Sequence, residues 1–292
     1  MVSFLVISFV GLFVLLIPEY AYAWGPATHI YYGMEVLKDL SVLSPVVASI
    51  LKEFPYDFLY GCISADITVG KKYVEYRKHC HNWNVGFRIL HEAHDLSQKA
   101  FALGYLSHLA ADTVAHNFFV PGRMIRSYSK KPMGHTYWEI RADSLVGQKY
   151  WQEGGRISKK VQQRHDPLIR NIIERTLFSF EVNKTIFNSI LMIHRFKHWR
   201  RMVRKIGARS RWVLGLEDIE KYHHLSKLSI LDLLISMQDA ECYKLDPTGR
   251  ANFKRARELR KSLRRIAPRS RLNEETYHAV VRQLPVQVPP LY

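Results

Sequence analysis

Apolar positions along the chain follow a mainly helical period. They recur every three or four residues over most of the 292 residues, which is the spacing of one face of an α-helix. Strict alternation of apolar and polar residues, the pattern of a half-buried strand, is scarce. The sequence therefore predicts an all-α fold, a multi-helix bundle. The expected helices cover residues 30–40, 44–51, 87–120, 134–146, 168–180, 184–205, 225–242 and 250–266.

Proline and glycine mark the expected interruptions. Pro121 and Gly122 predict the end of the helical stretch that begins near residue 87. Asp166 followed by Pro167 predicts the start of another helix, with an N-cap and a proline in the first turn. Residues 54–77 have no regular period, so we expect a loop-rich stretch there.

The first 23 residues have the features of a signal peptide. Residues 2–17 are almost wholly apolar, and Ala21 and Ala23 are small residues at the positions that a signal peptidase recognises. Cleavage would make Trp24 the first residue of an exported, periplasmic or secreted chain. The leader contains no Lys or Arg, so retention as a membrane anchor is the alternative. The expected parts are a signal peptide (1–23), a helical domain (24–245), and a basic helical extension with a proline-rich tail (246–292).

Two stretches place metal-binding side chains one helical turn apart. His108, Asp112 and His116 follow one another at intervals of four, and His135 and Glu139 repeat the interval nineteen residues later. Residues i and i+4 share a face of a helix, so each set points in one direction. Imidazole and carboxylate are zinc ligands, although a single such pair is more often a satisfied pair in the core. Small residues flank the first set and leave room for a neighbouring helix or for ions: Gly104, Ser107, Ala111 and Ala115.

Further polar residues extend these sets into an ordered group. A processed chain would open Trp24-Gly25-Pro26-Ala27-Thr28-His29, Asp66 closes Gly61-Cys62-Ile63-Ser64-Ala65-Asp66, and His81 precedes Asn82-Trp83. From residue 24 to residue 139 this order resembles the zinc-dependent phospholipase C family and its single-strand nuclease relatives. The resemblance implies a site with three Zn²⁺ ions on an all-α fold.

The resemblance also implies a role for each candidate ligand. One ion would take Asp66, His81, His108 and Asp112, a second would take His116, His135 and Glu139, and a third would take Trp24, His29 and Asp112. Trp24 would contribute its free amine and its carbonyl, and Asp66 is the implied general base. An α-amine has a pKa of about 7.7–8.0, so zinc displaces its proton far more readily than the proton of a lysine.

Positive charge is concentrated in the second half of the chain. The net charge is +17, and 29 of the 43 Lys and Arg follow residue 150. Such a field attracts nucleic acids and anionic membrane surfaces alike. Residues 184–205 mix apolar and basic side chains, which suits either an interfacial helix or a core-facing stripe with solvated charges. Arg123, Arg126, Lys130 and Lys131 fall in the expected loop between the metal helices, where they would contact a substrate phosphate or remain solvated.

Taken together, these features predict an exported zinc-dependent phosphodiester hydrolase. The preferred substrate is a phospholipid at a peripheral membrane surface, cleaved into diacylglycerol and a phosphorylated head group. The short interval from Trp24 to His29 and the basic second half favour a zinc-dependent single-strand nuclease as the alternative. A non-catalytic, membrane-binding protein with structural zinc is the other alternative.

Overall fold

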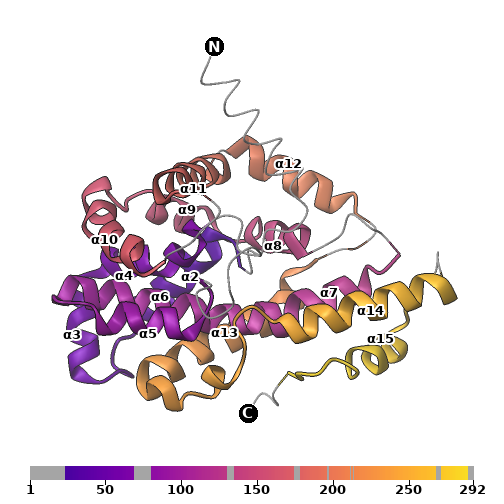
Figure 1. Ribbon diagram of the computed structural model, residues 1–292. Helices are drawn as coiled ribbons and strands as arrows, with labels where there is room; N and C mark the ends of the chain where they lie inside the picture. The colour runs from indigo at the N-terminus through magenta and orange to yellow at the C-terminus, as the bar shows by residue number, and fades with distance from the viewer. Residues whose placement is uncertain are drawn as a thin grey trace.

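The fold is a multi-helix bundle, as predicted, and its helices pack around α6 (Figure 1). The computed structural model describes residues 24–68, 80–129, 135–173, 178–195, 197–210, 212, 214–267 and 271–288, and these residues contain no strand. The central helix α6 (Leu96–Val114) packs against α4 (Pro55–Ser64), α5 (Trp83–His91) and α13 (Leu216–Ser236). Within the described ranges, no helix combines the length and the apolar character needed to cross a membrane.

The remaining helices surround this centre. They are α2 (Pro26–Lys38), α3 (Pro45–Glu53), α7 (Val120–Arg126), α8 (His135–Asp143), α9 (Gln148–Gly154), α10 (Lys159–Ile172), α11 (Phe180–Arg195), α12 (Lys197–Ala208), α14 (Arg250–Ile266) and α15 (Glu274–Val281). Single turns of 3-10 helix are formed by η1 (Ala65–Ile67), η5 (Met237–Asp239) and η6 (Glu241–Lys244). The predicted signal peptide, and with it the choice between export and a membrane anchor, lies outside the described residues.

The predicted helix end at Pro121 and Gly122 is wrong. A π-helical segment, η4 (Ala115–Phe119), joins α6 to α7, so that one helical run crosses the molecule (Figure 1). The Val120 N–H donates to the Ala115 carbonyl, five residues back, as expected for a π turn. Pro121 then falls in the first turn of α7, where a missing N–H is tolerated. The π turn lies directly at the candidate ligand His116.

The stretch expected to be a loop before Asp66 is largely the helix α4. Its residues 57–64 are all buried, so it has no polar face and hence no visible period. Two glycines allow it to cross α6 closely, because a Cβ on Gly61 would lie 2.0 Å from the Phe101 carbonyl oxygen. A Cβ on Gly104 would lie equally close to the Phe58 carbonyl oxygen. The predicted space for a neighbouring helix at Gly104 is therefore confirmed, and the crossing brings the end of α4 to the ligand face of α6.

The second half of the chain differs from the prediction in its boundaries. Helix α10 begins at Lys159, where the Ser158 hydroxyl accepts from the Val161 N–H at 3.2 Å, so Pro167 lies inside the helix and Asp166 is not its N-cap. On α11, Phe187 and Ile190 are buried, which favours the core-facing interpretation of its apolar stripe.

Candidate metal centre

Four of the predicted ligands meet at one buried point. They are Asp66 from η1, His81 from the turn before α5, and His108 and Asp112 from α6, each at most 1% exposed. His81 Nε2 lies 3.0 Å from Asp112 Oδ2, 3.3 Å from Asp66 Oδ1 and 3.0 Å from His108 Nε2. His108 Nε2 lies 3.2 Å from Asp112 Oδ2 and 4.0 Å from Asp66 Oδ1.

These separations suit the ligands of a single zinc ion. Four N and O atoms at about 2.0–2.2 Å from Zn²⁺ in a tetrahedron lie about 3.3–3.6 Å from one another. Burying two carboxylates and two imidazoles around one point is costly unless they are paired or bind a cation. The donor set therefore fits zinc in both chemistry and spacing.

Two histidines are held by backbone carbonyl groups in the orientation that a ligand needs. His108 Nδ1 lies 2.8 Å from the Cys62 carbonyl, and His116 Nδ1 lies 2.5 Å from the Pro247 carbonyl. A carbonyl only accepts, so Nδ1 carries the proton in each ring and Nε2 keeps its lone pair. Burial lowers the pKa of His116 to about 4, which keeps its imidazole neutral. Its Nε2 has no hydrogen-bond partner in the part of the chain that the structure describes.

Asp112 faces histidines with both of its oxygens. Oδ2 is close to His81 and His108, whereas Oδ1 lies 3.3 Å from His29 Nε2. The His29 ring stacks on the His108 ring with 3.8 Å between centroids. Burial alone would raise the pKa of the Asp112 carboxyl, but His108, His29 and His81 hold it well below its ordinary value. This geometry suits a carboxylate that bridges two cations.

Trp24 is anchored beside Asp112. Its buried indole donates from Nε1 to the Ala111 carbonyl at 3.1 Å. The ring is stacked between Phe119, at 4.9 Å, and His223, at 5.3 Å between centroids. Because Ala111 precedes Asp112 on α6, these contacts fix the start of the described chain next to His29 and Asp112.

Asp143, which the sequence analysis missed, fixes α2 against α8. Both the Thr28 N–H and the Thr28 hydroxyl donate to Asp143 Oδ1 at 2.8 Å. A Cβ on Gly25 would lie 2.2 Å from Asp143 Cγ, so only glycine fits there. A signal was present in the sequence, since Asp143 continues the four-residue interval of His135 and Glu139. Through Thr28, Asp143 determines the position of the adjacent His29.

His135 and Glu139 both belong to α8. Both are buried, and Glu139 lies one turn beyond His135. The Phe253 ring lies against His116 and His135 at 5.4 and 5.7 Å between centroids. His135 also contributes to lowering the pKa of His116, after burial. The structure thus brings His116 and His135 into one neighbourhood.

The segment after residue 245 takes part in the centre, which the sequence pattern did not indicate. Besides the Pro247 carbonyl and the Phe253 ring, Gly249 packs on the backbone of His116. Its φ is +57°, and a Cβ there would lie 2.3 Å from the His116 carbonyl oxygen. The predicted division between residues 245 and 246 remains a prediction.

The proposed role of the arginines between the metal helices is not supported. Arg123 and Arg126 belong to α7 instead of a loop. Arg123 Nη2 lies 2.9 Å from Asp218 Oδ1, and Arg126 forms a two-pronged contact with Glu274 at 2.6 and 2.7 Å. Both arginines therefore join helices of the bundle. Lys130 and Lys131 lie outside the described residues.

Comparison with known proteins identifies the family of this chain. The sequence model described as zinc dependent phospholipase C matches residues 28–184, more than half of the chain. The chain belongs to the zinc-dependent phospholipase C family. The matched span contains all the candidate ligands except Trp24. Neither the curated proteins nor the solved structures contain a significant match.

Proposed function

We propose that the protein is an exported phospholipase C that uses three Zn²⁺ ions to hydrolyse phospholipids to diacylglycerol and a phosphorylated head group. The observation that carries this proposal is the buried group of Asp66, His81, His108 and Asp112, whose donor atoms are 3.0–4.0 Å apart within the family span.

Each proposed ion has its own set of ligands. One ion would be held by Asp66, His81, His108 and Asp112, a second by His116, His135 and Glu139, and a third by Trp24, His29 and Asp112. Bound zinc would supply Lewis-acid polarisation of the phosphoryl group and would lower the pKa of a water molecule towards about 7.

The chain's own residues orient these ligands. The Cys62 and Pro247 carbonyls fix the rings of His108 and His116, so that each Nε2 is aimed without rearrangement. Asp112 would be shared by two ions, because its two oxygens face different histidines. In this proposal Asp66 accepts the proton of the attacking water.

Processing is part of the proposal. Cleavage after Ala23 would free the α-amine of Trp24, whose indole is already held beside Asp112. A chain that kept residues 1–23 would have a peptide nitrogen at that position, and an amide is a poor zinc ligand at neutral pH. Mass spectrometry of the purified protein determines which terminus is present.

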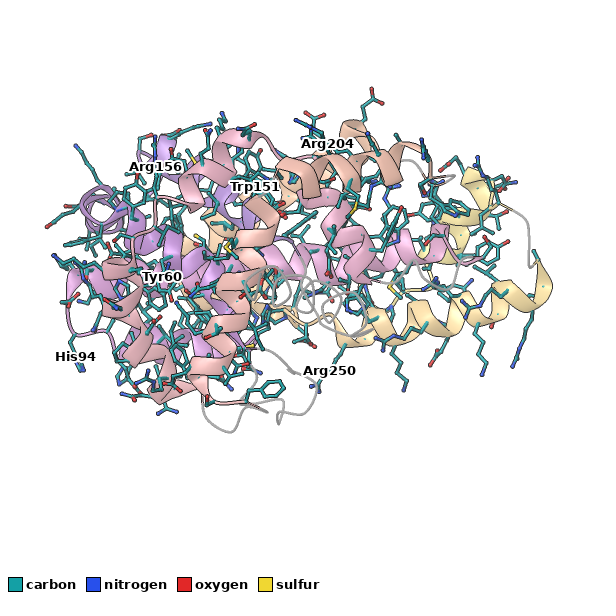
Figure 2. The ribbon with its side chains drawn as sticks, turned by 90° about the horizontal axis from the view of Figure 1, so that it is seen from above. Tyr60, His94, Trp151, Arg156, Arg204 and Arg250 are labelled. Atoms are coloured by element: carbon teal, nitrogen blue, oxygen red, sulfur yellow. The ribbon has the colours of Figure 1, made fainter. Side chains whose placement is uncertain are left out.

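The test combines metal content with two substrates. Zinc per chain is measured together with diacylglycerol release from phosphatidylcholine and cleavage of single-stranded DNA. We expect His108→Ala to lower both zinc content and diacylglycerol release. His94→Ala is the matched control, because His94 is exposed at the edge of the molecule (Figure 2).

Three outcomes would contradict the proposal. Cleavage of DNA without release of diacylglycerol would identify a nuclease. A zinc-loaded protein that is inactive on both substrates would indicate a structural role for the metal. Unchanged zinc content in His108→Ala would reject the ligand assignment.

A further inference from the structure

Helix α14 carries a dense row of positive charge. Its 17 residues contain eight Lys or Arg and one acidic residue, Glu258, for a net charge of +7 (8 − 1). Four exposed members form what we call the basic stripe: Lys254, Arg257, Lys261 and Arg265. At about 100° and 1.5 Å per residue, they fall within an arc of roughly 80° and span roughly 16 Å along the helix. The stripe is therefore a straight row on one side of α14.

The opposite side of α14 is fixed to the bundle. Phe253, Ala256 and Leu259 are buried, and Phe253 contacts the ring of His116. Asn252 donates from Nδ2 to the Asn117 carbonyl at 2.5 Å. These contacts hold α14 along the edge of the molecule (Figure 1), and long side chains extend outwards from it (Figure 2). The stripe is thus presented on a rigid support.

The charges of the stripe lack acidic partners within the described ranges. Glu258, the acidic residue of the helix, lies 3.3 Å from Arg255, which is not a member of the stripe. Neighbours in the stripe are three or four residues apart, a spacing at which like charges repel on a helix. An external anion would relieve this repulsion, which makes the stripe a binding surface instead of a set of internal ion pairs.

We propose that the basic stripe binds the anionic surface of a phospholipid membrane. A straight row on a rigid helix can lie parallel to a flat array of head groups, and each basic residue near such a surface adds to the attraction. Single-stranded nucleic acid fits less well, because its binding sites use exposed aromatic rings for stacking. Among the side chains that the structure describes, no Phe, Tyr or Trp is exposed. Binding through the stripe requires no hydrolysis, so it can be tested separately from the proposed activity.

The experiment measures partition of the full, zinc-loaded chain onto vesicles of phosphatidylcholine with and without phosphatidylglycerol. The test variant carries Lys254→Gln, Arg257→Gln, Lys261→Gln and Arg265→Gln. The control variant removes the same charge from exposed lysines of α3, α6 and α10, at the other end of the molecule (Figure 1): Lys52→Gln, Lys99→Gln, Lys159→Gln and Lys160→Gln. Release of diacylglycerol is followed in the same samples, so that loss of binding is distinguished from loss of hydrolysis.

We expect the stripe variant to bind anionic vesicles more than tenfold less tightly than the unmodified chain, since each basic residue is worth about fivefold at low salt. The control variant should stay within about twofold, because charges more than about 10 Å from the surface are screened at 0.1 M salt. The proposal is overturned if both variants lose vesicle binding equally, or if the stripe variant loses none. Weakened binding of single-stranded DNA with unchanged binding of vesicles also overturns it.

A second measurement does not depend on the folding of a variant. Lysine acetylation of the unmodified chain is compared with and without anionic vesicles. Protection of Lys254 and Lys261, but not of Lys159 and Lys160, supports the proposal. Protection confined to Lys159 and Lys160, or equal modification of all four lysines, contradicts it.

Discussion

The close crossing of α4 and α6 predicts that zinc binding depends on Gly104, a residue that is not itself a proposed ligand. Replacing Gly104 by alanine would place a Cβ 2.0 Å from the Phe58 carbonyl oxygen, and that oxygen belongs to the backbone. Ordinary contact begins near 3.4 Å, so the two helices must separate by more than 1 Å. His108 Nε2 and Asp66 Oδ1 are already 4.0 Å apart across this crossing, so further separation removes Asp66 from the donor set.

We expect Gly104→Ala to lose stability and zinc affinity together. Overpacking of this kind costs about 1–3 kcal/mol, partly offset by up to about 1 kcal/mol from the better helix propensity of alanine. In a domain of this size each kcal/mol lowers the melting temperature by roughly 2–4 °C. Displacement of a residue that supports a metal ligand lowers metal affinity by about 10- to 100-fold.

Thermal melting and competition with a zinc chelator provide the two readouts. Gly154→Ala is the matched control, because its Cβ would meet Ile30 at an ordinary 3.4 Å. Gly104→Ala with the melting temperature and zinc affinity of the unmodified chain would refute the proposed coupling between the helix crossing and the metal centre.

Three further predictions address other parts of the structure. Asp143→Ala should lower the affinity for one zinc ion by about 10- to 100-fold, because Thr28 loses its two hydrogen bonds to Asp143 and the adjacent His29 is then less firmly positioned. An equal loss of affinity for all the zinc ions in a chelator titration would contradict this. Burial lowers the pKa of His223 to about 4, so the zinc-free protein should lose stability as pH falls from about 6.5 to 4, by up to about 1.4 kcal/mol per pH unit from this group. His223→Gln should make the melting temperature less dependent on pH over that range, whereas His94→Gln, at an exposed position, should leave the pH dependence unchanged. Because Arg123 pairs with Asp218, Arg123→Met should lower the free energy of unfolding by about 1 kcal/mol in denaturant titrations. The kcat and KM for phosphatidylcholine should stay within about twofold of the unmodified chain. A tenfold loss of kcat would instead indicate that Arg123 has a catalytic role.

The helices that carry the candidate ligands could be predicted from the sequence, because a four-residue interval between ligands indicates that they share one face of a helix. His108 and Asp112 can meet a common ion only if they share a helix face, and the spacing of four residues encodes that face. The α4 helix left no such signal, because residues 57–64 are buried on every side. The continuation through Pro121 was equally hidden, since a π turn places this proline where its missing N–H is harmless.

The support of the ligands was the least predictable part of the centre. The Cys62 and Pro247 carbonyls orient two histidines, and any residue type provides a carbonyl, so the side-chain pattern could not reveal them. Phe253 comes from a segment distant in sequence and carries no metal-binding group. Only tertiary packing brings these groups to the ligands that the sequence identifies.

Native mass spectrometry of the purified protein tests most directly whether the buried histidines and carboxylates hold zinc. We predict a chain that begins at Trp24 with three Zn²⁺ bound, and at least one ion fewer in His108→Ala. A folded chain without stoichiometric zinc, or a His108→Ala variant with the full complement of ions, would contradict the assignment of the centre.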